Sequence, residues 1–561
     1  MHRALPLTLL VWTGCARPNT PTPGTEETAH TALPPPVDIE QIEVTVNPYL
    51  AAPLTAVVSL AHPDLDPAAV EEASLTLSSE DPACGPVEVT WDPRSEGFQR
   101  AFGLADWEGL PGGLALPVLG LCPNTEHTAA FTLRSPGATW VAEASITAGG
   151  VSAVDGETVT VTVADTARMA PGWTWLGKRV YDERGTLRWF GPDVLTRLED
   201  GTFLAGLQTW NVLGRQLTER TMPEGLQSHH DTIGLPDGHI LVCASDASTT
   251  IVKNGVTKKS GQDLVVELDD ATGELVNSWD LRAFFDVDRE TVSAQGSDWF
   301  HLNTLAYDPV ADAIVVSGRY QGVAMLTRGG EHREDPGAGK ALRWLIAPHL
   351  DWGLAGPDGT GPDDPHDALL TAVDGQARPY PQPVQDNLEA PSGTDDFHWP
   401  VGQHGLDVQR LGDGRVQVLL FDNQGSFLFD GPGTTSNGVT FTAQGDLSND
   451  RAQPPYSLLL ELEVDEVAGT VREVSSYGAD RPDLYGSYNG GVARFPEVGT
   501  RMMLSNGVDQ HDPENVLQPN VVEVAEDGTV VFALRIDGSV FSAYHGGRVD
   551  LLRPWSATDD P

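Results

Sequence analysis

The sequence predicts an all-β protein with two folded parts, an N-terminal β-sandwich followed by a β-propeller. The chain has 561 residues, 40% of them hydrophobic, which is more than one compact core normally holds. Its 59 glycines and 42 prolines indicate many turns. Short apolar runs bounded by turn residues recur along most of the chain, as expected for β-strands.

The N-terminal residues 1–15 are typical of a lipoprotein-type signal peptide. Arg3 precedes an apolar run from Ala4 to Trp12, which is too short to span a membrane. The run ends in Gly14-Cys15, which resembles the signal in which a cysteine is lipidated, although Trp12 stands where leucine is usual. We therefore expect export to the periplasm or cell surface, with membrane contact only through a lipid at Cys15. Plain secretion with cleavage nearby is the alternative.

The next residues, 16–36, are rich in proline and threonine and predict a linker that buries no core. Residues 37–150 then alternate apolar and polar positions in short runs, such as "IEQIEVTV" and "HTAAFTLRS". The length and strand spacing fit a small immunoglobulin-like β-sandwich. Cys84 and Cys122 fall in this part, and an exported compartment permits a disulfide between them, with two free buried thiols as the alternative. Cys243 is expected in a buried strand, and no cysteine spacing indicates a metal site.

Residues 166–556 contain a looser repeat, in which an Asp-Gly or similar turn precedes four to seven apolar-rich residues. It recurs in "LEDGTFLAGLQ", "LPDGHILVCAS", "DDATGELVNSW", "LGDGRVQVLLFDN" and "AEDGTVVFALRI". Asp-Gly between apolar runs is a strong hairpin signal. Repeated hairpins over such a length predict a β-propeller, and we expect six blades. A long Gly/Pro-rich insertion, starting at Ala347, interrupts the pattern.

The formal net charge of −46 excludes one class of partner and restricts another. Such a surface repels phosphate backbones, so nucleic acid is not an expected partner. An anionic substrate would need a local exception to this field, built from arginine and histidine.

Three histidines occupy similar places in the repeat, each just ahead of an apolar strand. His230 lies in "QSHHDTIGLPDGHIL", His301 in "SDWFHLNTLAYDP" and His404 in "VGQHGLDVQRLGDG", while Arg319 ends the strand that follows His301. The strand nearest a propeller axis is reached from the previous blade, so residues at its start can face the central channel. These side chains are therefore predicted to converge at one end of the channel.

Neighbouring polar residues leave alternatives open. Asn303 either joins the site or caps a turn, and Asp231 either orients His230 or satisfies the hairpin backbone. Phe421 to Asn423 indicate a turn after a core strand. A lone histidine at a strand start is more often a surface or turn residue, and His239 is interpreted that way.

These segments, taken in order, resemble the bacterial PAPS-independent aryl-sulfate sulfotransferases, which are β-propellers with an N-terminal β-sandwich. The resemblance covers most of the chain. It is carried by "NPYLAAPLTAVV" and "LPVLGLCPNTEHTAAFTL" in the first part and by "HHD…LPDGHIL", "DWFHLNT", "SGRYQG", "GQHGLDVQRLGDG…LFDNQ", "YSLLLELEVDEVAGTVREVSSYG" and "YGSYNGGVARFPEVGTRMMLSNG" in the second.

The resemblance implies roles for individual residues. His404 corresponds to the nucleophile that accepts the sulfuryl group. His301, Arg319 and one histidine of the opening pair correspond to residues that hold the sulfate oxygens. We favour His230 over His229 for that place. Asn303 and His229 are then candidate substrate-binding residues, and the implied reaction partners are an aryl sulfate and a phenol.

The chemistry fits these residue types without a cofactor or metal. Sulfuryl transfer develops charge on the sulfate oxygens and the leaving phenolate, so positioning and electrostatic stabilisation dominate, much as in phosphoryl transfer. Arginine offers a planar fork of donors, and a neutral imidazole is a competent nucleophile. The alternative is a secreted ligand-binding propeller without catalysis; a quinone-dependent dehydrogenase is less favoured, because no cofactor or calcium signature is found. The sequence leaves a homodimer open.

Overall fold

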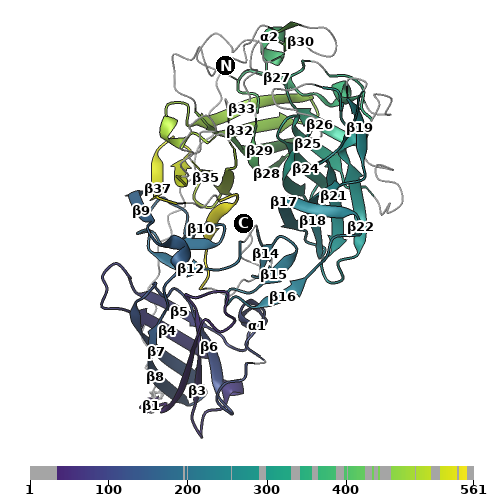
Figure 1. The fold of residues 1–561 in the computed structure, drawn as a ribbon. Helices are drawn as coiled ribbons and strands as arrows, with labels where there is room; N and C mark the ends of the chain where they lie inside the picture. The colour runs from purple at the N-terminus through teal and green to yellow at the C-terminus, as the bar shows by residue number, and fades with distance from the viewer. Residues whose placement is uncertain are drawn as a thin grey trace, which may run out of the picture.

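The protein folds almost entirely into antiparallel β-sheets, as the sequence predicts (Figure 1). The computed structural model describes residues 35–552 except 106, 194–195, 199, 254–255, 290–297, 330–340, 351, 357–363, 387–396, 401, 424–432, 435–439, 442–455, 487, 507–517 and 540–542. The predicted signal peptide and most of the linker therefore lie outside the described residues. No helix in the described part of the chain is long and apolar enough to cross a membrane.

The N-terminal part contains two sheets, which contribute to one hydrophobic core. The five-stranded sheet has the order β1 (Val37–Asp38), β8 (Ala138–Thr147), β7 (Glu126–Ser135), β4 (Glu72–Ser78) and β5 (Val87–Trp91). The three-stranded sheet has the order β2 (Gln41–Val46), β3 (Ala56–Ala61) and β6 (Leu114–Val118). Buried and exposed residues alternate along β4, β7 and β8, so one face of the larger sheet is covered.

A disulfide joins Cys84 to Cys122 in this part, which settles the alternative that the sequence left open. Arg188, in β12 (Leu187–Phe190), places Nη1 3.4 Å from each of the two sulfurs. The same guanidinium donates to Gly85 and Gly120 carbonyls and pairs with Asp182. Arg188 therefore ties the N-terminal sheets to the strands that follow them. Cys243 lies fully buried in a strand, as predicted.

Six further sheets follow in the described part of the chain. Each contains four antiparallel strands, and in the first of these sheets one of the four strands comes from a distant part of the chain. The first sheet has the order β12-β11-β10-β38, with β10 (Trp173–Leu176), β11 (Arg179–Tyr181) and β38 (Gly546–Val549). The second has the order β13 (Thr196–Arg197), β14 (Phe203–Ala205), β15 (Gln208–Trp210) and β16 (Gln216–Glu219). The next two are β17 (Leu226–Gly234), β18 (His239–Asp246), β21 (Leu264–Asp269) and β22 (Leu275–Asp280), and β23 (Leu302–Asp308), β24 (Ala313–Gly318), β25 (Gly322–Thr327) and β26 (Leu342–Ile346).

The last two sheets each gain a fifth strand. One is β28 (His404–Gly412), β29 (Arg415–Asp422), β32 (Leu458–Asp465) and β33 (Thr470–Tyr477), joined by the short β27 (Thr371–Ala372). The other is β34 (Gly491–Phe495), β35 (Thr500–Ser505), β36 (Asn520–Ala525) and β37 (Val530–Asp537), joined by β9 (Thr158–Ala164). The described residues also form two hairpins, β19 (Thr250–Lys253) with β20 (Val256–Lys259) and β30 (Gly433–Thr434) with β31 (Thr440–Phe441), and the helices α1 (Glu96–Phe102) and α2 (Gln382–Gln385). Short 3-10 helices span Pro67–Ala69, Ser152–Val154, Leu281–Ala283, Pro365–Ala368 and Pro482–Leu484.

The predicted Asp-Gly turns each join two paired strands. Gly201, Gly238, Gly414 and Gly528 have φ values of 83°, 83°, 75° and 79°, which glycine adopts without a Cβ penalty. They connect β13 to β14, β17 to β18, β28 to β29 and β36 to β37. The local turn chemistry thus fixes where each hairpin reverses.

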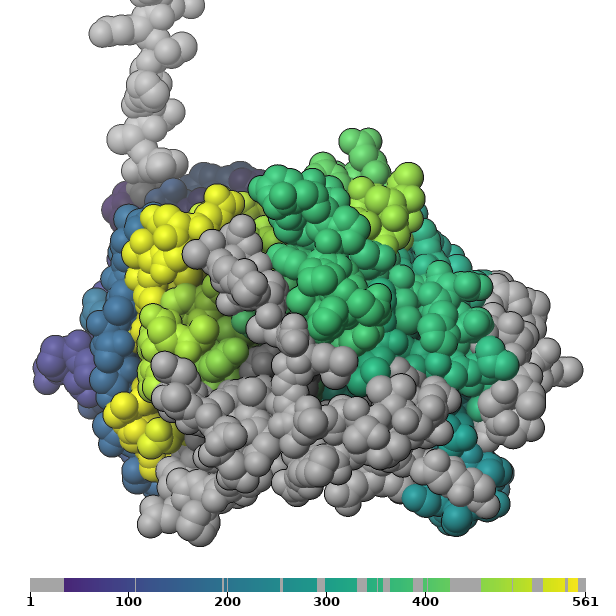
Figure 2. Space-filling view, turned by 90° about the horizontal axis from the view of Figure 1, so that it is seen from above, coloured from purple at the N-terminus to yellow at the C-terminus, as the bar shows by residue number. Residues whose placement is uncertain are grey.

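The first strands of successive sheets contact one another, which brings the strand starts together. β17 contacts β23, β23 contacts β28, β28 contacts β34, and β34 contacts β38. Strands from the two ends of this region also pair, β10 with β38 and β9 with β37. Viewed from above, segments coloured blue lie beside segments coloured yellow, as these pairings require (Figure 2).

Candidate functional site

The three predicted histidines stand at irregular starts of three neighbouring strands. The β17–β18 register shifts between Ser228 and Thr232, the β23–β24 register between Leu302 and Thr304, and the β28–β29 register between His404 and Leu406. Such bulges redirect side chains and are common beside functional sites.

The backbone at these bulges adopts conformations that are uncommon for ordinary residues. His230 has φ 49°, His301 has φ 55° and Gly405 has φ 60°. A non-glycine residue with positive φ is uncommon and persists where the surrounding structure holds it. Each histidine is therefore aimed by a local distortion of its strand.

The structure brings these imidazoles to one place. The rings of His230 and His301 lie 4.9 Å apart between centroids. Tyr544 connects the third, because its ring centroid is 5.9 Å from that of His230 and 5.9 Å from that of His404. The hydroxyl of Tyr544 donates to the carbonyl of Asn303, which fixes the phenol ring between them.

Each of the three imidazoles is held through Nδ1, and by a different kind of partner. Nδ1 of His404 lies 2.6 Å from Oδ1 of Asn423, a neutral amide. Nδ1 of His301 lies 2.6 Å from Oδ2 of Asp298, a carboxylate. Nδ1 of His230 lies 2.9 Å from Nδ1 of His229, a second imidazole. In every case Nε2 is the nitrogen left to act on a ligand.

The surroundings keep two of these rings uncharged near neutral pH. His404 is 1% exposed, and burial, together with the charge of Arg319, holds its pKa well below the usual value of a histidine. Burial lowers the pKa of His230 to about 3, with further contributions from His301 and His229. Burial also lowers the pKa of His229 to about 4. A neutral imidazole has a lone pair on one nitrogen and a proton on the other.

Arg319 lies directly beside His301, as the sequence spacing predicted. It follows β24, and its backbone N–H donates to the His301 carbonyl at 3.0 Å. Its guanidinium carbon lies 5.7 Å from the ring centroid of Tyr320, and burial lowers its pKa without removing its charge at neutral pH. Its positive charge also contributes to the lowered pKa of His404 and His230.

The two predicted substrate-binding residues, Asn303 and His229, lie beside the three imidazoles. Asn303 is fully buried, and its Nδ2 donates to the Gln403 carbonyl at 2.7 Å. Within the described residues its Oδ1 has no hydrogen-bond partner. His229 contacts His230, and only His230 of this pair has a ring contact with His301.

Asp231 does neither of the two things considered from the sequence. Its Oδ2 accepts from the backbone N–H of Leu305 at 2.9 Å, in the next sheet. Its Oδ1 lies 3.2 Å from Nε2 of His545, an ion-pair distance that lacks hydrogen-bond geometry. Asp231 therefore fixes the spacing between the strands that carry His230 and His301.

Sequence reasoning missed four residues of this site, namely Asn423, Tyr544, His545 and Asp298. Asn423 was interpreted as part of a turn. It follows β29, whose Phe421 pairs with His404, so antiparallel register alone could have placed it beside that histidine. Asp298 begins the quoted segment "DWFHLNT", but its role was not recognised. Tyr544 and His545 follow no motif and belong to a segment that is placed by the pairing of β38 with β10 and by hydrogen bonds between Asn506 and the backbone of Ala543.

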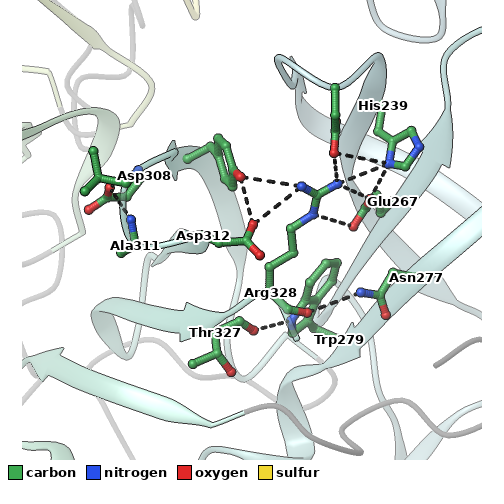
Figure 3. Close-up of polar contacts among 12 residues, drawn as sticks. His239, Glu267, Asn277, Trp279, Asp308, Ala311, Asp312, Thr327 and Arg328 are labelled. Atoms are coloured by element: carbon green, nitrogen blue, oxygen red, sulfur yellow. Dashed lines mark hydrogen bonds and ion pairs between the residues drawn. The ribbon is translucent and has the colours of Figure 1, made fainter. Parts of the chain in front are cut away.

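A second polar cluster, which contains Arg328 and His239, lies between two sheets (Figure 3). Nη2 of Arg328 lies 2.6 Å from Asp237 and 2.5 Å from Glu267, and His239 approaches the same glutamate at 2.5 Å. Burial opposes the charge of Arg328, but hydrogen bonds to Glu267 and Asp237 outweigh it and raise the arginine pKa. Asp237, His239 and Glu267 have ligand atoms close enough for a metal, yet the guanidinium already neutralises them. This cluster stabilises the packing of the sheets containing β18 and β25.

The imidazole site can therefore stabilise an oxyanion and supply a nucleophile in the same place. His404 offers a ring that burial keeps neutral, and an arginine and two further imidazoles belong to the same site. Such a combination suits transfer of a group with anionic oxygens.

The chain was compared with known proteins and family models. Among curated proteins it is 23% identical to the arylsulfate sulfotransferase AssT of Escherichia coli over 50% of this chain and 46% of that protein. It is 24% identical to the arylsulfate sulfotransferase AssT of Lelliottia amnigena over the same shares. The chain thus matches about half the length of these relatives.

Similar solved structures include a periplasmic gluconolactonase of Pseudomonas aeruginosa, with a TM-score of 0.25 and 12% identity over 86% of this chain and 99% of that chain. The WD40 domain of SCAP from fission yeast has a TM-score of 0.19 and 10% identity over 90% and 92% of the two chains. Likenesses at these scores support no argument.

The model of the arylsulfotransferase (ASST) family matches residues 174–544, which is more than half of the chain and contains His230, His301, Arg319 and His404. The chain belongs to the arylsulfotransferase family.

Proposed function

We propose that the protein transfers a sulfuryl group from an aryl sulfate to a phenol through a sulfohistidine at His404, without a nucleotide sulfate. The observation that carries the proposal is the Nδ1 contact of His404 with Asn423, combined with a pKa held well below the usual value. These features support a neutral ring at pH 7 whose Nε2 lone pair is available for attack on sulfur.

In the first half of the reaction, Nε2 of His404 attacks sulfur while the bond from sulfur to the aryl oxygen breaks. The electron pair of that bond leaves with the phenolate, and the ring becomes an N-sulfo-imidazolium that retains its Nδ1 proton. In the second half, the oxygen of another phenol attacks the same sulfur and gives up its proton, the N–S bond breaks, and the pair returns to Nε2. The proton that this phenol loses to solvent balances the one that the departed phenolate takes up.

Arg319, His301 and His230 are proposed to hold the three sulfate oxygens. Arg319 supplies a forked cation, and His301 can present an N–H from Nε2 while Asp298 accepts from its Nδ1. His230 has a pKa of about 3 and is therefore neutral. When its Nδ1 accepts a hydrogen bond from His229, its Nε2 carries the proton and can donate. Asn303 and His229 then contribute to substrate binding by positioning these groups.

The proposed architecture is one six-bladed β-propeller, residues 166–556, beside an immunoglobulin-like β-sandwich, residues 37–150. Support comes from the contacts between successive first strands and from the two pairings that join distant parts of the chain. Strand β9, which precedes residue 166, would belong to the propeller through its pairing with β37. We further propose export to the periplasm or cell surface, with a lipid anchor at Cys15.

The test incubates the purified mature protein with a chromogenic aryl sulfate and a phenol in the absence of nucleotide sulfate. We expect phenol release and ping-pong kinetics, with parallel double-reciprocal lines for donor and acceptor. His404→Ala should fall to background, and Arg319→Ala should lose about 10²–10³ in rate, by analogy with the loss of an oxyanion-hole donor.

His62→Ala serves as the control, since His62 lies in the N-terminal part, where its Nδ1 accepts from the backbone N–H of Asp64. It should keep wild-type turnover. Near-normal transfer by folded His404→Ala would show that another residue is the nucleophile. Binding of aryl sulfates without phenol release would favour a ligand-binding protein instead.

A further inference from the structure

The buried amide of Asn423 sits at the end of β29, opposite the start of β28, and makes its shortest contact with His404. We propose that Asn423 is a positioning residue that fixes which ring nitrogen of His404 carries the proton. The inference rests on the proposed function for the role of His404 as nucleophile. Its geometric part concerns only the protonation of the ring and can be tested without substrate.

The orientation of the Asn423 amide is determined by its other partners. Nδ2 donates to the Gly486 carbonyl at 2.7 Å and to the Asn489 carbonyl at 2.9 Å. A flipped amide would place its oxygen against two carbonyl oxygens, which cannot donate. Oδ1 must therefore face His404, and an amide oxygen can only accept.

This orientation assigns the tautomer of His404. Because Oδ1 accepts at 2.6 Å, Nδ1 of the ring must carry hydrogen, and in the neutral ring Nε2 must then hold the lone pair. A ring with the opposite tautomer would present N–H to the sulfur and could not attack. Asn423 thus keeps His404 in the one neutral form that can form the N–S bond.

The choice of an amide rather than a carboxylate has a chemical consequence. A carboxylate beside Nδ1 favours the imidazolium form, which has no lone pair. Of the partners of His230, His301 and His404, the carboxylate of Asp298 stands at His301, which is proposed to donate to oxygen. At His404 the neutral amide orients the ring, and burial and the charge of Arg319 outweigh the small support that its hydrogen bond gives to the protonated form.

The surroundings of Asn423 hold the amide rigidly between two sheets. Ser457 Oγ accepts from the backbone N–H of Gly486, so the carbonyl that anchors Asn423 is itself fixed. Asn489, which provides the second anchor, has φ 56° and precedes β34. A Cβ at the adjacent Gly490 would lie 2.3 Å from Phe421, so the two segments approach very closely there.

The first experiment reads the tautomer directly. The protein is labelled with ¹⁵N-histidine, and the His404 signals are assigned by their loss in His404→Gln. Wild type should show Nδ1 protonated and Nε2 unprotonated at pH 7, and Asn423→Ala should show a mixture or the reverse. Asn211→Ala is the control, because Asn211 is equally buried and bonds the backbone of Phe102 in α1 and of Arg215 in the turn between β15 and β16. It should leave the His404 signals unchanged.

The second experiment measures the donor half-reaction against pH. Asn423→Ala should lose about 10²-fold or more, since a wrong tautomer in a catalytic triad costs about 10⁴. Asn423→Asp should show an acid limb displaced to higher pH than in wild type, because its carboxylate favours the protonated ring. If Asn423 had a purely structural role, its variants would lower the rate equally at every pH. Asn211→Ala should behave in that way if it weakens the fold.

The outcomes separate this inference from the proposed function. Protonation of Nε2 in wild type, or an unchanged His404 tautomer in Asn423→Ala, would overturn the inference even if the protein transfers sulfate. The expected tautomers in a protein that turns over no aryl sulfate would support the inference and defeat the sulfotransferase proposal. Unshifted acid limbs in Asn423→Asp, with a folded protein, would also contradict it.

Discussion

At the scale of single residues, the fold keeps three imidazoles of the site neutral, those of His229, His230 and His404. Burial is the largest cause of the lowered pKa of His230, His229 and His404. Sequence spacing and the family resemblance were enough to name His230, His301, His404 and Arg319 as candidates. Neither supplied Asn423, because a buried amide after a strand looks the same in sequence whether it ends a turn or orients a ring. Only the register of β28 against β29 would have placed it beside His404.

These neutral rings make stability depend on pH. In the unfolded chain a histidine takes up a proton as pH falls through about 6.5, whereas folded His230 does so only near its pKa of about 3. The unfolded state therefore binds more protons in this window, and stability falls as pH falls. We expect the stability advantage of wild type over His230→Gln to shrink by up to about 2 kcal/mol between pH 7 and pH 5.

Urea unfolding of both proteins at several pH values measures that difference. Val242→Ala is the matched control, since Val242 is fully buried and pairs with Thr232 in the same hairpin but does not titrate. Its difference from wild type should stay constant with pH. A constant difference for His230→Gln as well would mean that the native ring takes up its proton near pH 6.5.

At the scale of strands, the sequence predicted regular hairpins. The proposed function depends on the bulges that interrupt them. Period-two alternation and Asp-Gly turns located the strands, because both are local signals. The bulges at His230, Asn303 and Gly405 follow from contacts between sheets. One example is the hydrogen bond from Gly405 N–H to Oγ1 of Thr304, which joins residues far apart in sequence. No local pattern could have predicted them.

Gly405 gives the prediction at this scale. Its φ is 60°, and a Cβ there would lie 2.8 Å from Cα of Gly491 in the next sheet. Backbone cannot move aside as a flexible side chain can, so Gly405→Ala should displace the start of β28 together with His404. We expect a lower melting temperature and a loss of transfer rate larger than the loss of stability alone would cause.

Gly412 lies at the other end of the same strand and provides the comparison. Its φ is 87°, but a Cβ there meets nothing within 4 Å. Gly412→Ala therefore carries the backbone strain, about 1–3 kcal/mol, without the collision. Thermal melts and donor-side kcat/KM of the two variants separate these effects. Equal losses in both would show that the closeness of β28 to β34 has no part in forming the site.

At the scale of the whole molecule, a net charge of −46 surrounds a site proposed to bind an anion. The composition alone showed that the chain is strongly acidic. It also predicted that a site for an anion would need a local group of arginine and histidine. Arg319 and the imidazoles are that exception, but a cluster at a few strand starts does not cancel the field of the entire surface.

Ionic strength should therefore affect the two substrates differently. Salt screens the repulsion of an anionic aryl sulfate, with a Debye length that falls from about 10 Å at 0.1 M to about 3 Å at 1 M. We expect kcat/KM for the sulfate donor to rise as sodium chloride is added, and kcat/KM for an uncharged phenol to change little. A fall for the donor would indicate that local attraction by Arg319 outweighs the surface charge.

The pairing of β38 with β10 has a consequence in time. A ribosome makes β10 early and β38 only near the end of the chain, so the edge of β10 stays unpaired through most of synthesis. Unpaired edges invite association with other chains, and distant pairings form slowly. Tyr544, which lies between His230 and His404, reaches its place with the same late segment. Chains that stop before this segment thus lack Tyr544, so the proposed sulfuryl transfer should require that β38 has paired with β10.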